Sequence, residues 1–247
     1  MAEFFLELFS EEIPVSLQKK LRKELLQEIN KIFEDKSIKS KKNFSLSTPN
    51  RLIVVFQGLD KQVEIKSEEI KGPSTSSAPQ ALEGFLKSKN IDKNNVFKKK
   101  IDKGEFYFFK TKKKKLKTFD LLSENLPQII NDFKWKKSMK WGNFDLNWGR
   151  PLKSILSIFD KKHIKFEFYH IFSSNSTYVD KDFEQRKKTF TTFKSYEKYL
   201  KKNGSIVDHN KRSEIIDKEF LKILNKKKLT IRDNPKLIDE VINLVDN

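Results

Sequence analysis

The sequence predicts an α+β fold in which mixed or antiparallel sheets pack against helices, followed by the start of a helical region. Two patterns carry this prediction. Runs such as 3–9 and 104–110 are short and rich in phenylalanine and other strand-forming residues. Longer segments such as 17–33 repeat apolar residues at helical spacing. The 22 phenylalanines among 247 residues can supply an aromatic core, although only 36% of the residues are hydrophobic.

The first half of the chain contains the clearest turn and cap signals. Ser16 is the expected N-cap of a helix. The pair Pro49-Asn50 predicts a hairpin turn, and Pro79 suits the first turn of a short helix. The predicted strands span 3–9, 44–46, 51–56 and part of 60–70, the predicted helices span 17–33 and a short segment from Pro79, and the predicted loops span 10–14 and 72–77.

The second half is predicted in the same way. Thr118 and Asp208 are expected helix caps. The alternation of Phe166, Phe168, His170 and Phe172 predicts one strand. The predicted strands span 104–110, 152–159 and 165–172, and the predicted helices span 118–130, 193–202, a segment after Asp208, and 237–245.

Composition also predicts how the chain divides. Its character changes after Ser173, which predicts an α+β body over 1–173 and a mainly helical region over 174–247, the incomplete start of a helical domain. A Gly-Pro-Ser loop and a lysine run flank residues 60–114, a possible inserted lobe. The lysine run at 112–115 fits a solvated strand edge that discourages pairing, or a track for phosphates.

The net charge of +18 predicts a polyanionic partner such as nucleic acid. However, 46 of the 52 basic residues are lysines, an excess that also fits AT-rich coding. The absence of cysteine excludes disulfides, thiol catalysis and cysteine-ligated zinc. The acidic N-terminal stretch is not a signal peptide, and no run is long enough to span a membrane. We therefore expect a soluble, cytoplasmic protein with no membrane partner.

Rare residues gather around Lys136, Lys137, Lys140 and Trp141, and the cluster continues to Arg150. All three tryptophans lie within or next to this segment. Indole faces interleaved with basic residues can contact a base or a cation. Alternatively, the segment is a turn whose tryptophans fill a core.

The patterns of a catalytic centre are missing from the sequence. It contains neither a glycine-rich dinucleotide fingerprint nor a P-loop, and its three histidines are isolated from one another. No spacing of histidine and carboxylate residues indicates a metal site. We therefore expect no catalytic residue, cofactor site or metal site on this chain.

Several short patterns resemble one family in both order and spacing. Residues 5–14 resemble the opening L-x-E-I-G-T-E-E-L-P of the bacterial glycyl-tRNA synthetase beta subunit, and 48–52 resemble its T-P-R-R-L. Residues 137–142 and 150–151 resemble its K-S/L-M-R-W-G and R-P. The remaining likenesses are at 71–73 (G-P), 81–85 (A-x-x-G-F/W), 104–105 (K-G-E), 208–212 and 237–241. At 180–183 only the phenylalanine of the family's G-H-R-F is kept, which puts a contact there in doubt.

The resemblance implies a tetrameric enzyme of two alpha and two beta chains. The alpha subunit would carry the class II active site for glycine and ATP with Mg²⁺, and the beta chain would bind and position tRNA(Gly). The later helical and anticodon-binding domains of the family are missing from this sequence. On this basis the central segment is a candidate RNA or subunit contact. Within it, Lys136, Lys137, Lys140 and Arg150 are candidate phosphate contacts, and Trp141 is a candidate for stacking or buttressing.

Arg51 is a further candidate contact, or it braces its own turn. Two other functions stay open at this point. One is a stand-alone RNA-binding module, and the other is a non-catalytic protein–protein scaffold.

Overall fold

The computed structural model describes residues 1–65, 67–101, 104–111, 113–135, 137–178, 187–230 and 234–245. The chain forms two compact units. The large unit combines Met1–Lys61 with Lys117–Asn247, and the small unit is Gln62–Leu116. The segment 60–114, considered above as an inserted lobe, overlaps the small unit. The division at residue 173 stays a prediction.

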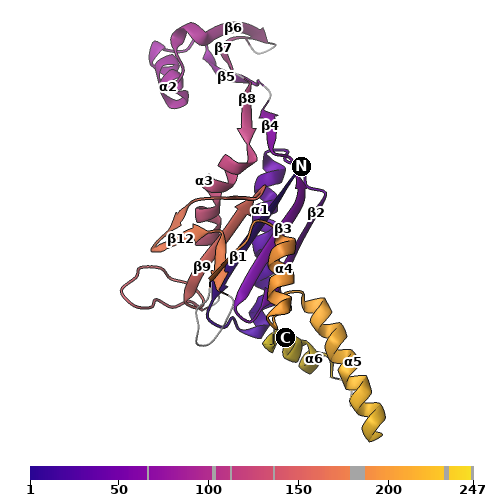
Figure 1. Ribbon diagram of the computed structural model, residues 1–247. Coiled ribbons are helices and arrows are strands. Elements are labelled where there is room, and N and C mark those ends of the chain that lie inside the picture. The colour runs from indigo at the N-terminus through magenta and orange to yellow at the C-terminus, as the bar shows by residue number, and fades with distance from the viewer. Residues whose placement is uncertain are drawn as a thin grey trace. The chain divides into compact units, whose positions relative to one another are not determined.

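The large unit is an α+β structure, as the sequence predicts (Figure 1). Its helices are α1 (Val15–Asp35), α3 (Thr118–Asn131), α4 (Phe193–Lys202), α5 (His209–Lys227) and α6 (Pro235–Leu244). Its strands are β1 (Ala2–Ser10), β2 (Lys42–Thr48), β3 (Arg51–Leu59), β9 (Leu152–Phe159), β10 (Lys162–His163), β11 (Glu167–Phe168), β12 (Ile171–Ser174), β13 (Ser176–Tyr178) and β14 (Lys187–Thr189).

The main sheet of the large unit is mixed. Its strand order is β11-β12-β9-β1-β3-β2, with β10 added beside β9. The strands pair in antiparallel fashion except β12 and β9, which are parallel. β2 and β3 form the predicted hairpin around Pro49-Asn50. β13 and β14 form a separate antiparallel pair.

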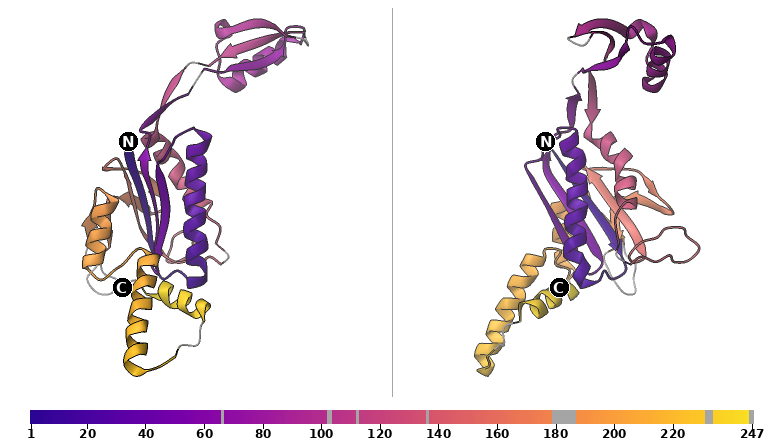
Figure 2. Two further views of the ribbon diagram at one scale, coloured as in Figure 1. Left: turned by 90° about the vertical axis from the view of Figure 1, so that its right-hand side faces the viewer. Right: turned by 180° about the vertical axis from the view of Figure 1, so that it is seen from behind.

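Both faces of the main sheet are buried, which is why β1 lacks a clean alternation of polar and apolar residues. On one face, Phe4 packs against Phe33 of α1 and Phe56 of β3, with ring centroids 6.5 and 6.2 Å apart. On the other face, Phe5 packs against Phe193 and Tyr196 of α4 at 5.8 and 5.3 Å. Figure 2 shows α1 and α4 on opposite sides of this sheet. The large unit therefore has three layers.

The caps of the helices match the predictions only in part. Asp208 caps α5 as predicted, because its side chain accepts a hydrogen bond from the Asn210 backbone N–H at 3.0 Å. Ser16 is not the cap of α1, since the helix already begins at Val15 and Pro14 occupies the cap position. Thr118 is likewise the first residue of α3, and its hydroxyl donates to the Asp60 carbonyl at 2.6 Å.

The single strand predicted over 165–172 is wrong. The segment instead forms a hairpin of β11 and β12. Tyr169 has a left-handed backbone, with φ of 53°, and reverses the chain direction between the two strands. A non-glycine residue rarely adopts this conformation, so the alternation of phenylalanines gave no sign of the turn.

The small unit contains helix α2 (Pro79–Lys89), the short 3₁₀ helix η1 (Lys93–Asn95) and two sheets. The three-stranded sheet has the order β5-β7-β6, from β5 (Glu69–Ser74), β7 (Gly104–Lys110) and β6 (Val96–Ile101). The second sheet pairs β4 (Gln62–Ile65) with β8 (Lys114–Lys117). The loop predicted over 72–77 is partly wrong, because β5 extends to Ser74. Among the described residues of the whole chain, no helix is long and apolar enough to cross a membrane.

Candidate functional site

The tryptophan-rich segment forms an exposed loop with a narrow base. We call residues 137–150 the tryptophan loop. Met139 and Trp148 form an isolated antiparallel bridge, with N–O distances of 2.8 and 3.1 Å in the two directions. Gly142 lies at the far end of the loop with φ of +57°, a conformation that glycine adopts without strain. The bridge therefore closes the base of the loop. Most residues between its ends are exposed to solvent, whereas Leu146 is buried and Trp141 is half-buried.

An aromatic cluster supports this base. Trp148 is 2% exposed and stacks on Phe133, with ring centroids 5.6 Å apart. The Trp135 ring meets Trp148 edge-on at 5.2 Å, and Phe168 of β11 completes the cluster at 6.0 Å. Gly149 is required by this packing, because a Cβ there would lie 1.8 Å from Cε3 of Trp135. Trp148 thus belongs to the core, which agrees for this residue with the interpretation of the segment as a turn whose tryptophans fill a core.

Three of the candidate contact residues lie together on the loop. Lys137 and Lys140 are exposed, and the Lys140 ammonium lies 3.5 Å from the Asp145 carboxylate. Trp141 is half-buried, with its ring centroid 6.3 Å from that of His170. Lys136 lies outside the described residues. The loop therefore presents two cations beside one partly open indole.

Arg150 lies apart from this group, at the base of the loop. Its Nε donates to the Glu12 carbonyl at 3.0 Å, and one terminal nitrogen donates to the Gly149 carbonyl at 3.2 Å. These bonds fix the guanidinium against the connection between β1 and α1. Arg150 is half-buried, so part of its charge still faces solvent.

Arg150 borders a cleft of about 550 Å³. The cleft is lined by the β1–α1 connection, the Pro49-Asn50 turn, Lys153 and the end of α6. Backbone hydrogen bonds join these segments, from Glu11 N to Pro151 O at 2.9 Å and from Ile13 N to Pro49 O at 2.7 Å. Lys153 also pairs with the Glu11 carboxylate at 2.6 Å. Opposite charges therefore meet at the rim of the cleft.

Three buried amide side chains line the cleft: Gln18, Asn50 and Asn243. Their N–H₂ groups donate to backbone carbonyls, for example from Gln18 to Ile13 and to Asn243 at 3.1 and 2.9 Å. Within the described part of the chain, their amide oxygens accept no hydrogen bond. A partner group that donates N–H or O–H bonds would satisfy these oxygens.

Arg51 lies in the core, where its side chain is 2% exposed. Its guanidinium lies 3.5 Å from the Glu7 carboxylate, donates to the Tyr178 carbonyl at 2.8 Å, and covers the Phe9 ring at 4.3 Å. Tyr196 and Thr177 donate to the same carboxylate. Burial and the Glu7 charge raise the pKa of Tyr196 well above 10, so it remains a donor at neutral pH. Arg51 therefore joins β3 to β1 and β13 within the core.

Arg212 joins the C-terminal helices to the sheet. Its guanidinium donates to the carbonyls of Ile242, Ile206 and Ser47 at 3.0, 2.5 and 3.0 Å. Nearby, Arg22 donates to Nε2 of His209 at 2.9 Å. Burial, followed by the charge of Arg22, lowers the pKa of His209 to about 4, so its imidazole is neutral at pH 7.

The chain matches a family model described as glycyl-tRNA synthetase beta subunit over residues 4–247. It belongs to this family. A glycine–tRNA ligase beta subunit from Rickettsia canadensis (strain McKiel) is 36% identical over 246 residues, which cover 100% of this chain. One from Rickettsia bellii (strain OSU 85-389) is 37% identical over 244 residues, which cover 99% of it. The resemblance found in the sequence motifs is thus confirmed.

The chain spans only part of the length of these beta subunits, because each match covers 37% of the relative. Several segments that carry the resemblance meet around the cleft. The motifs at 5–14, 48–52 and 150–151 all contribute lining residues or backbone bonds there. In this chain the three motifs therefore hold one another in place through backbone hydrogen bonds.

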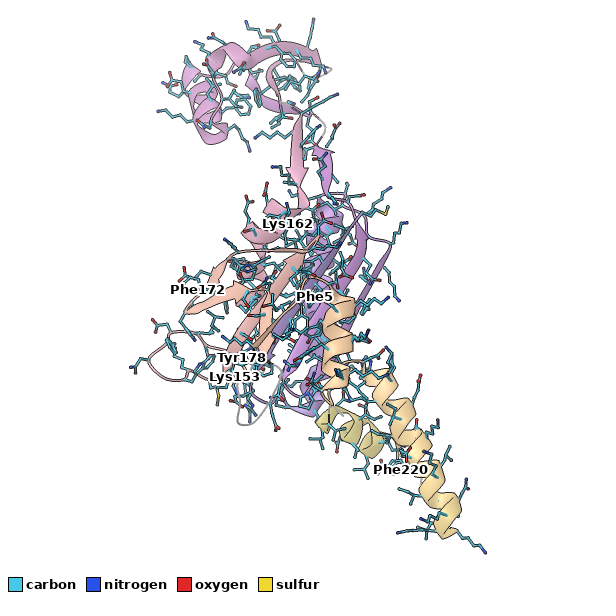
Figure 3. All side chains as sticks on the ribbon, in the orientation of Figure 1. Phe5, Lys153, Lys162, Phe172, Tyr178 and Phe220 are labelled. Carbon is cyan, nitrogen blue, oxygen red and sulfur yellow. The ribbon has the colours of Figure 1, made fainter. Side chains whose placement is uncertain are left out.

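The sequence did not point to Gln18, Asn243 or Lys153 as site residues. Gln18 lies within a regular amphipathic helix, and Asn243 lies near the end of another, where a polar residue normally faces solvent. Lys153 lies between Leu152 and Ser154 near the start of β9 and resembles an ordinary solvent-facing strand residue. Lys153 and Tyr178, both labelled in Figure 3, approach the same Phe9 ring, at 5.9 and 5.5 Å from its centroid. Only the fold brings these residues to one place.

Proposed function

We propose that this chain acts as the N-terminal part of a glycyl-tRNA synthetase beta subunit, which binds and positions tRNA(Gly) while an alpha subunit attaches glycine with ATP and Mg²⁺. The family match over residues 4–247 carries this proposal. In this proposal the complex is a cytoplasmic α2β2 tetramer. The described residues contain no group of histidine or acidic residues able to hold a metal ion. The proposal leaves the chemistry to the alpha subunit.

The tryptophan loop is the proposed RNA contact on the large unit. Lys137 and Lys140 are exposed point charges on a loop whose base is fixed, so they can approach phosphates without reorganising the core. The half-buried Trp141, next to Lys140 in the chain, offers part of an indole ring for a base or ribose. Arg150, fixed by the Glu12 carbonyl, extends the positive surface toward the cleft.

Charging kinetics with the alpha subunit and the full-length natural beta chain test the proposal. Replacing Lys137 and Lys140 with Gln should raise the KM for tRNA(Gly) and leave kcat largely unchanged, because the contacts bind tRNA equally in the ground and transition states. The plot of log affinity against log salt should become shallower by roughly 0.9 per lost phosphate contact. Lys19 and Lys23, exposed on α1, provide a control double variant with the same loss of charge.

The controls decide what a loss of activity means. Size-exclusion chromatography must show that each variant still assembles with the alpha subunit. The Trp141→Phe variant keeps a flat ring, so it should retain more affinity than Trp141→Ala. If the two double-lysine variants lose equal affinity, the contact is non-specific and the assignment to the tryptophan loop is wrong. If the unaltered chain supports no charging, the ligase proposal itself fails.

A further inference from the structure

The small unit carries a second surface that the proposed function does not use. The register of its three-stranded sheet pairs Phe97 with Phe108, Lys99 with Phe106, and Lys71 with Phe108. Paired residues on adjacent strands point to the same side of a sheet. These five side chains therefore share one face, which we call the phenylalanine face.

Helix α2 covers the opposite face. Gly72 follows Lys71 in β5 and so points away from the phenylalanine face. A Cβ at Gly72 would lie 3.0 Å from the ring of Phe85, a residue of α2. Within the described part of the small unit, α2 is the only α-helix. No α-helix of this unit therefore covers the phenylalanine face.

The rings on the open face are held in place by one another and by lysine stems. Phe97 stacks on Phe108, with centroids 6.1 Å apart and an interplanar angle of 27°. Phe108 is 8% exposed, whereas Phe97 is 38% exposed. The ammonium of Lys71 lies 3.6 Å from the centroid of Phe106, and that of Lys99 lies 5.4 Å from Phe108. The face thus presents the exposed ring of Phe97, with Lys99 farther along the same strand and Lys71 across the central strand β7.

The charge of the small unit favours a polyanion on this face. Residues 62–116 contain 14 lysines and seven acidic residues, a net charge of +7. Lys99 is already paired with Glu69 at 2.5 Å, which fixes its stem across Phe108. An exposed aromatic ring with lysines on the same face is an arrangement by which proteins hold single-stranded nucleic acid. Double-stranded RNA hides its base faces and could not use Phe97 in this way.

We propose that the phenylalanine face binds an unpaired segment of RNA, with one base stacked on Phe97 and the adjacent phosphates near Lys71. That this RNA belongs to tRNA(Gly) rests on the proposed function, whereas the stacking itself does not. The tryptophan loop and the phenylalanine face are then two separate RNA contacts on one chain.

Equilibrium binding of the 247-residue chain to a labelled single-stranded RNA of about 12 nucleotides tests the inference. The RNA carries 2-aminopurine, whose fluorescence is quenched when it stacks. The same strand annealed to its complement is the double-stranded comparison. Phe97→Ala should weaken binding to the single strand by roughly 5- to 150-fold, the cost of losing one stacked base. It should also relieve the quenching, whereas Phe97→Tyr should preserve both.

Two matched controls separate stacking from general effects. Phe172 is 68% exposed in β12, so Phe172→Ala removes an exposed ring outside the small unit (Figure 3). Lys98 points to the α2 side of the sheet, so Lys98→Gln removes the same charge as Lys71→Gln from the other face. Lys71→Gln should weaken binding more than Lys98→Gln. Circular dichroism must show that each variant is folded.

The outcomes distinguish this inference from the proposed function. Equal affinity for single-stranded and double-stranded RNA overturns the inference. It is also overturned if Phe97→Ala binds within twofold of Phe172→Ala. If Trp141→Ala weakens tRNA binding and Phe97→Ala does not, the inference fails and the proposed function stands. If only Phe97→Ala weakens binding, the phenylalanine face is confirmed and the tryptophan-loop contact is lost.

Discussion

The buried pair of Arg51 and Glu7 makes a prediction about stability. Arg51→Met should lower the free energy of unfolding of the large unit by about 3–5 kcal/mol, because it leaves the Glu7 carboxylate buried without its cation. The Tyr178 carbonyl would also lose its donor. The hydroxyls of Tyr196 and Thr177 would still bind the carboxylate and limit the damage.

Urea unfolding followed by tryptophan fluorescence measures this cost. All three tryptophans lie in the large unit, so the signal reports on that unit alone. Lys153→Met is the matched control, since Lys153 also contacts the Phe9 ring but pairs with Glu11 at an exposed position. An exposed ion pair contributes only about 0–1 kcal/mol. The double variant Glu7→Gln with Arg51→Met should cost less than the sum of the two single variants.

The reasoning would be refuted if Arg51→Met cost no more than Lys153→Met. That result would mean that the guanidinium contributes little to holding β1 against β3. The burial of Arg51 would then not be explained by its contribution to stability, and its role as a candidate RNA contact would be open again. An additive double variant would show that the two side chains do not interact.

Three further predictions concern single residues. Gly149→Ala should destabilise the large unit by roughly 1–3 kcal/mol in circular-dichroism melts, because its Cβ would collide with Trp135. Gly84→Ala is the control and should be neutral or stabilising, because nothing lies within 4 Å of a Cβ at that position. The pKa of His209 in the folded protein, about 4, lies below its unfolded value of 6.5, so the unfolded state binds the proton first as the pH falls. The free energy of unfolding should therefore decrease as the pH drops from 6.5 to 4. In His209→Gln the urea midpoint should decrease less over this range. Arg212→Met should leave three backbone carbonyls without their donor, and hydrogen exchange should then accelerate in α5 and α6 while β1 stays protected.

The sequence was a good guide where one local pattern decides the structure. The strand over 3–9, the hairpin at Pro49-Asn50 and the helix capped by Asp208 each follow from residues adjacent in the chain. The prediction failed at 165–172, because Tyr169 reverses the chain with none of the residues that usually mark a turn. It also misplaced the N-cap of the first helix by two positions, since Pro14 occupies that position and its side chain makes no cap hydrogen bond.

The candidate site shows the same limit. Lys137, Lys140 and Trp141 are neighbours in sequence, so their shared place on one loop could be expected, although Trp141 is half-buried while both lysines are exposed. The burial of Arg51 could not, because its partners Glu7, Phe9 and Tyr178 lie in β1 and β13, far from Arg51 along the chain. The cleft depends on the same long-range assembly, in which α6 brings Asn243 to Gln18. Local patterns cannot report such contacts.

Initial rates of glycine attachment to tRNA(Gly) test the central claim most directly. They should be measured with the alpha subunit alone, with the alpha subunit and the full-length beta chain, and with a beta chain carrying Lys137→Gln, Lys140→Gln and Trp141→Ala. We predict little charging by the alpha subunit alone, full charging with the unaltered beta chain, and a raised KM for tRNA(Gly) with the assembled variant. Equal charging with and without the beta chain would contradict the account.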